Sequence, residues 1–328
     1  MLRAFLSRAR DPIVILPYVG FGSPRRLVVC GRVLQDEGIR PAAADEPRWR
    51  NLVAFFKRLE SDEVPGARVR ARLVSRLGRW AEATTNREGY FRIELRGDGY
   101  GWNDVALELV RDPRVRAVTR VLVPSPRARF GVISDIDDTV IRTNVTSRTR
   151  MLLTVALTNA RTRKPFAGVA AFYRALHGGL NPVFYVSKSP WNLYAPLVDY
   201  LAIQGLPEGP LLLRDFGLRM PKRHKEASIE RILETYPRMK FVLVGDSGEE
   251  DPEIYSRVVR EHAGRILAVY IRNVRPHPER VAAVRRLEMT GRELFGSHGF
   301  LGVAQLREQR HMVARLQLRV RNVLVDEL

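Results

Sequence analysis

Residues 129–141 read RFGVISDIDDTVI, and this stretch decides the fold. The segment Phe130–Ser134 is mostly apolar and β-branched, which is typical of a strand buried on both faces of a parallel sheet. Four polar residues follow it closely: Asp135, Asp137, Asp138 and Thr139. Three carboxylates at such short spacing repel one another and lose hydration, so a fold tolerates them most simply around a cation such as Mg²⁺. The alternative is a polar turn that caps the next helix, since Asp and Thr both favour such positions.

The length and composition set the class of protein. A chain of 328 residues predicts two domains, and 45% apolar residues argue against global disorder. The single cysteine, Cys30, cannot form an internal disulfide and suits a reducing compartment. No apolar run reaches the roughly 20 residues that span a bilayer, and the first 22 residues lack the continuous apolar centre of a signal peptide. We therefore expect a cytoplasmic protein.

The formal net charge is +19 at pH 7. A field of this sign attracts polyanions, which include nucleic acid and anionic membrane surfaces. Most of the positive charge is Arg and is spread along the whole chain, so a bias in base composition is an alternative source of it.

The first part of the sequence predicts short strands. Strand patterns occur at residues 27–34, 69–73, 90–95, 102–110 and 118–123, and a helical pattern occurs at 47–61. This spacing favours a small β-sandwich domain over residues 1–125. The fragments VPGARVRA and TTNREGYFRIEL resemble the prealbumin-like sandwich that stands beside many carboxypeptidase domains. The domain shows no acid/base pair or metal cluster, so we expect it to serve as a scaffold or in docking.

Beyond Pro124 and Pro126 the pattern changes to strands that alternate with helices. The predicted strands are 129–135, 182–187, 211–215, 241–246 and 266–272, and the predicted helices are 168–177, 191–204, 225–236, 252–263 and 278–295. This rhythm requires right-handed crossovers and predicts an α/β domain over residues 126–296, with a parallel sheet covered by helices on both faces. Ligands of such sheets bind beyond the carboxyl ends of the strands.

Reactive side chains gather at four predicted strand ends or the loops after them. They are Asp135 and Asp137, then Ser187 and Lys188, then Lys225 in PKRHKEAS, and finally Asp246 followed by Glu249, Glu250 and Asp251. Each has an ordinary interpretation when taken alone. Ser187 suits a turn, Lys225 a solvated helix position and Asp246 a helix cap. However, the chain has only six Lys, and three of them fall in these segments.

The combination resembles a known family. DxDxT, a strand-end Ser, a Lys and then GD with an acidic residue four or five positions later resemble the haloacid dehalogenase (HAD) superfamily of phosphatases. More narrowly, DIDDT with YVSKSPWNLY, HKEASIERIL and GDSGEEDPEIY is similar to the actin-patch type of Mg²⁺-dependent phosphatidate phosphatase. The resemblance covers about residues 129–275. It implies a HAD-like Rossmannoid sheet and an enzyme that is a phosphoric monoester hydrolase.

The resemblance also implies roles for the residues. Asp135 would be the nucleophile that forms an aspartyl-phosphate, and Asp137 would be the general acid and base. Mg²⁺ would bind Asp135, the main-chain carbonyl of Asp137, Asp246 and the loop that contains Asp251. Ser187, Lys188 and Thr139 would contact the phosphate, and Lys225 would balance the charge of the aspartyl-phosphate. Asp138 departs from the Gly of many superfamily members, although the actin-patch group shares it.

Two segments of the sequence are candidates for binding a membrane surface. The insert at about 142–166 occupies the place of a superfamily cap, and its apolar centre Met151–Leu157 is flanked by basic residues. The tail 297–328 is amphipathic and basic. Each is either an ordinary packed element or a segment that presses into an anionic bilayer.

Three functions remain open at this point. The first is a peripheral-membrane phosphatidate phosphatase that binds anionic phospholipid surfaces and releases diacylglycerol and phosphate. The second is a phosphatase for a soluble or nucleic-acid-end phosphomonoester, which the positive charge would serve equally well. The third is a non-catalytic protein that binds lipid or nucleic acid, which the presence of both Asp135 and Asp137 disfavours.

Overall fold

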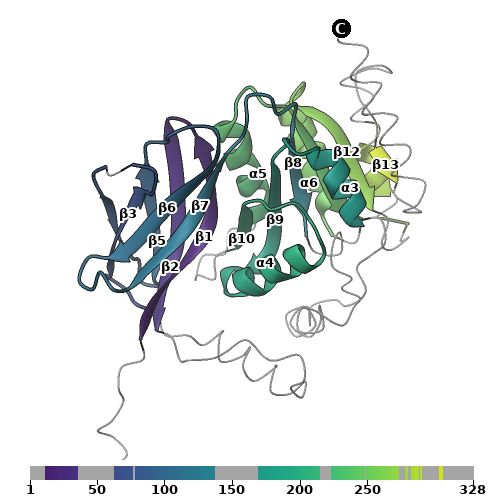
Figure 1. Ribbon diagram of the computed structural model, residues 1–328. Coiled ribbons are helices and arrows are strands. Elements are labelled where there is room, and N and C mark those ends of the chain that lie inside the picture. Colours follow the sequence, from purple (N-terminus) through teal and green to yellow (C-terminus); the bar gives the residue numbers. More distant parts are fainter. Residues whose placement is uncertain are drawn as a thin grey trace, which may run out of the picture. The chain divides into compact units, whose positions relative to one another are not determined.

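The structure is a computed structural model, and its chain divides into two compact units, Met1–Pro124 and Ser125–Leu328 (Figure 1). No helix in the described part of the chain is both long and apolar enough to cross a membrane. The described residues are 12–35, 63–76, 78–136, 169–214, 223–247, 249–272, 278–279, 282–287, 289 and, for the backbone only, 303–305.

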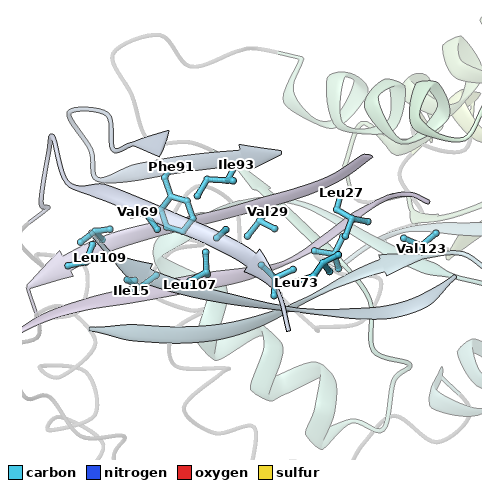
Figure 2. Packing of buried hydrophobic residues seen from close by; sticks show 14 residues of the cluster. Ile15, Leu27, Val29, Val69, Leu73, Phe91, Ile93, Leu107, Leu109 and Val123 are labelled. Carbon is cyan, nitrogen blue, oxygen red and sulfur yellow. The ribbon is translucent and has the colours of Figure 1, made fainter. Parts of the chain in front are cut away.

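The described part of the N-terminal unit is a β-structure. Its strands are β1 (Ile13–Ser23), β2 (Arg26–Gln35), β3 (Arg68–Leu73), β4 (Ala81–Thr84), β5 (Tyr90–Leu95), β6 (Gly101–Leu109) and β7 (Arg116–Val123). Every second residue of β3 is buried, namely Val69, Ala71 and Leu73, as the alternation of apolar and polar residues requires. Figure 2 shows such residues from several strands packed into one apolar core.

The strand pairing of the mostly-β unit is continuous. The described strands form one hydrogen-bonded sheet in the order β4-β3-β6-β7-β1-β2-β5. The reason is β1, which pairs antiparallel with β2 and also parallel with β7 at Gly20 and Phe21. This strand therefore joins what would otherwise be two separate sheets. The pairing of β1 with β2 shifts register between Tyr18 and Phe21.

The second unit alternates strands and helices. Its strands are β8 (Gly131–Asp135), β9 (Val183–Pro190), β10 (Leu211–Arg214), β11 (Phe241–Asp246), β12 (Ile266–Arg272) and β13 (Val303–Gln305). Its helices are α3 (Val169–His177), α4 (Tyr194–Ile203), α5 (His224–Thr235) and α6 (Asp251–Glu261), with a 3₁₀ turn η1 (Trp191–Leu193) before α4. The fold class is therefore α/β, as the sequence predicts.

The strands of this unit form one parallel sheet in the order β10-β9-β8-β11-β12-β13. The chain moves from β8 outward to β10, returns through α5 to β11, and then moves outward in the other direction. Right-handed crossovers place α3 and α4 on one face and α5 and α6 on the other (Figure 1). Contacts agree with this arrangement, because Arg174 of α3 donates to the carbonyl of Gly205 after α4, and Glu226 of α5 pairs with Arg257 of α6.

The strand order therefore reverses between β8 and β11. In a doubly wound sheet, crossovers leave this point in opposite directions and open a crevice at the carboxyl ends of the two strands. Both strands are fully buried, and each ends in an aspartate, Asp135 or Asp246.

Most predicted elements are confirmed to within a few residues. Strands β1 and β4 were not predicted from the sequence. In β1, Pro17, Gly20 and Gly22 interrupt the apolar pattern, yet the glycines are needed because a Cβ at Gly20 would lie 2.3 Å from the carbonyl oxygen of Val28.

Several predictions fall outside the described residues. These are the helix at 47–61, the insert at 142–166 and most of the tail 297–328. Only parts of the helix predicted over 278–295 are described, and those parts are helical. At the start of the tail, β13 pairs parallel with β12, so this short segment extends the sheet as a strand and does not form part of a helix.

Candidate metal and phosphate site

Asp135 and Asp246 end the two strands at which the strand order reverses. Both side chains are buried, with 1% and 0% of their surface exposed. Ser134 lies in register with Val244 of β11. Asp135 is one residue beyond this pair on β8, and Asp246 is two residues beyond it on β11, so both aspartates lie at the same end of neighbouring strands. The apolar residues of each strand anchor it in the core and leave its last side chain at the carboxyl edge of the sheet.

Asp251 adds a third buried carboxylate. It begins α6, and its Oδ2 accepts a hydrogen bond of 3.1 Å from the backbone N–H of Asp246. Gly245 makes this approach possible, because a Cβ there would lie 2.5 Å from Asp251 Oδ2 and 2.7 Å from a ring carbon of Tyr255. The Gly-Asp pair of the sequence is thus explained by the close contact of a carboxylate with the strand backbone.

Lys225 provides the counter-charge. It is the second residue of α5, and only 2% of it is exposed. Its Nζ lies 2.7 Å from Asp135 Oδ1 and also donates to Asp251 Oδ1. The ordinary interpretation of Lys225 as a solvated helix residue is therefore excluded. Burial by itself would lower the pKa of Lys225, but Asp135 and Asp251 outweigh it and hold that pKa well above its ordinary value.

The three carboxylates can bind one metal ion. Asp135, Asp246 and Asp251 each offer an oxygen, and these atoms all lie within 4.8 Å of one another. Three ionised carboxylates and one ammonium leave a formal charge of −2 in a buried site. A divalent cation would balance that charge, and carboxylate oxygens are the ligands that hard cations such as Mg²⁺ prefer.

Ser187 lies on the strand next to Asp135. Asp135 is in register with Val186 of β9, and Ser187 is the next residue of that strand. The side chain is fully buried, and its Oγ accepts a hydrogen bond of 2.9 Å from the N–H of Ser189. The strand continues to Pro190, three residues beyond the predicted end, so Ser187 lies within β9 and not in a turn after it.

Lys188 is partly exposed and lies at the edge of the site. Its Nζ is 3.3 Å from Glu249 Oε2 and 3.1 Å from Glu250 Oε2. Lys188 was predicted to contact phosphate, and its neighbours in this structure are these two carboxylates.

The structure brings together four of the predicted site residues, Asp135, Lys225, Asp246 and Asp251. Asp137 and Thr139 lie outside the described residues, as does Asp138.

Two buried tyrosines near the carboxylates were not predicted from the sequence. Tyr173 of α3 shares a hydrogen bond of 2.5 Å with Ser134 Oγ, and Tyr255 of α6 donates to the carbonyl of Val244. Burial is the largest cause that raises the pKa of each phenol, and Asp135 and Asp251 raise it further. Tyr255 could have been predicted from its spacing. It lies four residues after Asp251 on α6, and residues at this spacing share a helix face.

Comparisons with known proteins agree with the motifs. Residues 130–273 match the family described as the catalytic domain of phosphatidate phosphatase APP1. Phosphatidate phosphatase APP1 of Saccharomyces cerevisiae is 35% identical over 151 residues, which are 44% of this chain and 26% of the yeast protein. Residues 130–273 are therefore similar to the catalytic domain of APP1. The resemblance inferred from the four motifs is confirmed over this range.

Other similarities are weaker. An uncharacterized protein of Schizosaccharomyces pombe is 28% identical over 205 residues, which are 58% of this chain and 34% of that protein. The chain thus spans about a quarter to a third of the length of these two relatives. A phosphoserine phosphatase from T. onnurineus is similar with a TM-score of 0.33 and 10% identity, covering 59% of this chain and 97% of its own, which is too weak to support a conclusion. The family and the yeast protein of the APP1-type match are both described as phosphatidate phosphatases, which belong to the phosphoric monoester hydrolases.

Proposed function

We propose that the chain is a Mg²⁺-dependent phosphatidate phosphatase with a HAD-like catalytic domain, which hydrolyses phosphatidate to diacylglycerol and phosphate. The observation that carries this proposal is the buried group of Asp135, Asp246, Asp251 and Lys225 at the reversal of strand order. This group lies within the residues that match the APP1 catalytic domain. The similarity to phosphatidate phosphatase supports the choice of substrate.

The metal would be held by Asp135, Asp246 and Asp251, together with the main-chain carbonyl of Asp137. When bound, Mg²⁺ neutralises phosphate charge so that an anionic nucleophile can approach. The residues fit this ion, because they supply oxygen ligands and a net negative charge in a buried site. Lys225 is bonded to two of the carboxylates, which restrains their positions before any ligand binds.

The chain's own residues would perform the transfer in two steps. A carboxylate oxygen of Asp135 forms a bond to phosphorus while the ester bond to the diacylglycerol oxygen breaks, and Asp137 gives that oxygen a proton. In the second step Asp137 takes a proton from water, whose oxygen bonds to phosphorus and releases Asp135 and inorganic phosphate. Lys225 balances the negative charge on Asp135, and Ser187 donates its hydroxyl proton to a phosphate oxygen.

The substrate implies contact with a membrane. We propose that the protein is cytoplasmic and binds anionic phospholipid surfaces peripherally, through its net charge of +19 and through the insert 142–166 or the tail 297–328. The same charge would favour a nucleic acid that carries a terminal phosphomonoester. A nucleic acid with a terminal phosphomonoester is therefore the main alternative to phosphatidate as the substrate.

A panel of substrates tests the proposal. Phosphate release is measured from phosphatidate in mixed micelles, from a 3′-phosphorylated oligonucleotide and from p-nitrophenyl phosphate, each with Mg²⁺ and with EDTA. The proposal predicts the highest kcat/KM for phosphatidate and no release in EDTA. A preference of about tenfold or more for the oligonucleotide would assign the second substrate class. Absence of release from all three substrates would contradict a phosphatase function.

A further inference from the structure

An ion-pair cluster joins the end of strand β9 to the loop between β11 and α6, at the rim of the proposed site. Lys188 belongs to β9, and Glu249 and Glu250 lie between β11 and α6. The Nζ of Lys188 is 3.3 Å from Glu249 Oε2 and 3.1 Å from Glu250 Oε2. About a third of the Lys188 and Glu249 side chains is exposed, whereas 70% of the Glu250 side chain is exposed. The cluster therefore reaches the surface through Glu250, while the Glu249 Oε2 atom that faces Lys188 is buried.

The position of the cluster follows from the strand order. Strands β9 and β11 lie on either side of β8, so a contact between their ends passes over the end of β8. Val186 of β9 is in register with Asp135, and Lys188 is two residues beyond it. Lys188 therefore reaches toward β11 above the level of the proposed nucleophile.

The two lysines, Lys225 and Lys188, differ in their burial and in the carboxylates with which they form ion pairs. Lys225 is buried and bonded to Asp135 and Asp251, so it belongs to the fixed part of the site. Lys188 forms ion pairs with two carboxylates that are not among the three proposed metal ligands, although the backbone N–H of Glu249 donates to Asp246 Oδ1. Burial by itself would lower the pKa of Lys188, but Glu249 and Glu250 more than offset this and raise it, so the ammonium is charged at neutral pH.

We propose that Glu249 and Glu250 hold Lys188 in an ion-pair latch that an incoming phosphomonoester opens. In the open state the Lys188 ammonium donates to a phosphate oxygen, and the two carboxylates are released to solvent. The latch lowers the affinity of the site for phosphate, because each binding event must replace the hydrogen bond from Lys188 to Glu250 and the ion pair with Glu249. The inference rests on the proposed function for the identity of the ligand, and it makes Lys188 and the two glutamates determinants of phosphate affinity.

A double-mutant cycle tests the latch in the full-length chain. The variants are Lys188→Met, the pair Glu249→Gln with Glu250→Gln, and all three substitutions together. The dissociation constant of inorganic phosphate is measured by calorimetry in Mg²⁺, and kcat and KM are measured with p-nitrophenyl phosphate. Lys240→Met and Glu234→Gln serve as controls, because both side chains are exposed and Lys240 directly precedes β11, at the opposite end of the sheet.

The latch predicts opposite effects for its two sides. Lys188→Met weakens phosphate binding about tenfold and raises KM with little change in kcat. The paired Gln substitutions tighten phosphate binding about threefold, a size typical of exposed ion pairs. In the Lys188→Met background the same Gln substitutions give a smaller gain, because no lysine remains to be released.

Two results would overturn the latch. One is an equal gain from the Gln substitutions in both backgrounds, which would show general charge repulsion without competition for Lys188. The other is a lower melting temperature for Lys188→Met with unchanged phosphate affinity, which would assign the cluster to loop stability alone. The proposed function fails separately, if the wild-type chain binds phosphate and shows the cycle but hydrolyses no phosphomonoester.

Discussion

Buried polar side chains have different partners in the two units. In the N-terminal unit, those of Arg32, Thr85, Asn103 and Thr119 all bond to backbone atoms, and Arg32 also pairs with Glu63. Each satisfies a carbonyl or N–H group of its own sheet or of a loop beside it. These side chains complete a β-structure whose interior is otherwise apolar.

In the second unit, buried carboxylates converge on one another. Asp135, Asp246 and Asp251 come from two strand ends and one helix start, and a single lysine neutralises part of their charge. Such a cluster costs stability through desolvation and repulsion, and apolar residues would fill the same space more favourably. The contrast teaches that a buried polar group is a sign of function where its partners are other ionised side chains, and a sign of folding where its partners are backbone groups.

We expect the largest effect on activity from a substitution of Asp135 in the buried carboxylate cluster. Asp135→Asn preserves the size of the side chain but removes the nucleophile, so kcat for phosphate release falls by about 10⁴-fold or more. Asp104→Asn is the control, because this exposed carboxylate lies on β6 of the other unit. Initial rates with phosphatidate measure both variants. Equal rates for Asp135→Asn and wild type would contradict the assignment of the nucleophile.

The second effect compares two buried cations. Lys225→Met leaves Asp135 and Asp251 without their counter-charge, so the free energy of unfolding in EDTA falls by about 3 kcal/mol or more. Millimolar Mg²⁺ restores part of this loss, since the ion supplies positive charge to the same carboxylates.

Arg32→Met is the matched change in the N-terminal unit. It also lowers stability, because Arg32 donates to the carbonyl of Glu88 and pairs with Glu63, but Mg²⁺ does not restore it. Urea unfolding in EDTA and in Mg²⁺ distinguishes the two variants. The same response to Mg²⁺ in both would place the ion elsewhere than among the three carboxylates.

The third effect compares two crowded glycines. Gly245→Ala pushes on Asp251 Oδ2 at 2.5 Å, and Gly20→Ala pushes on the carbonyl oxygen of Val28 at 2.3 Å. Each substitution costs about 1–3 kcal/mol of stability. Only Gly245→Ala also weakens Mg²⁺ binding, by about tenfold or 1.4 kcal/mol. Calorimetric titration with Mg²⁺ measures this, and unchanged affinity in Gly245→Ala would exclude Asp251 from the metal site.

The smallest expected effect concerns a purely structural hydrogen bond. Thr119 Oγ1 donates to the carbonyl of Tyr18 over 2.9 Å. Thr119→Val removes it and lowers the free energy of unfolding by about 1 kcal/mol, while kcat and KM stay at the wild-type values. A changed KM for phosphatidate with unchanged folding would give the N-terminal unit a part in substrate binding.

Strands β8 to β12 of the α/β unit could be predicted from the sequence, because each is a short apolar run, and β8 and β11 end in an aspartate of the proposed site. The continuous β-sheet of the first unit was not readable. Its irregular strand β1 contains Pro17 and two glycines, which local patterns treat as breaks, whereas long-range pairing with β2 and β7 makes it a strand.

The sequence predicted which residues form the candidate site, but it did not predict which of them contact one another. Motif spacing placed Asp135, Asp246 and Lys225 at strand ends and a helix start. It could not show that Lys225 bonds to Asp251 as well as to Asp135, because that contact depends on how α5 and α6 pack against the sheet. For the same reason it could not show that Lys188 is paired with Glu249 and Glu250.

The most direct test of the central claim is chemical trapping of the phosphorylated residue. The wild-type chain is incubated with phosphatidate and Mg²⁺, quenched with borohydride, which reduces an aspartyl-phosphate to homoserine, and then mapped by peptide mass spectrometry. The account predicts homoserine at position 135, and none when Mg²⁺ is replaced by EDTA. Trapping at another aspartate, or phosphate release with no trapped residue under conditions that trap a known aspartyl-phosphate, would contradict it.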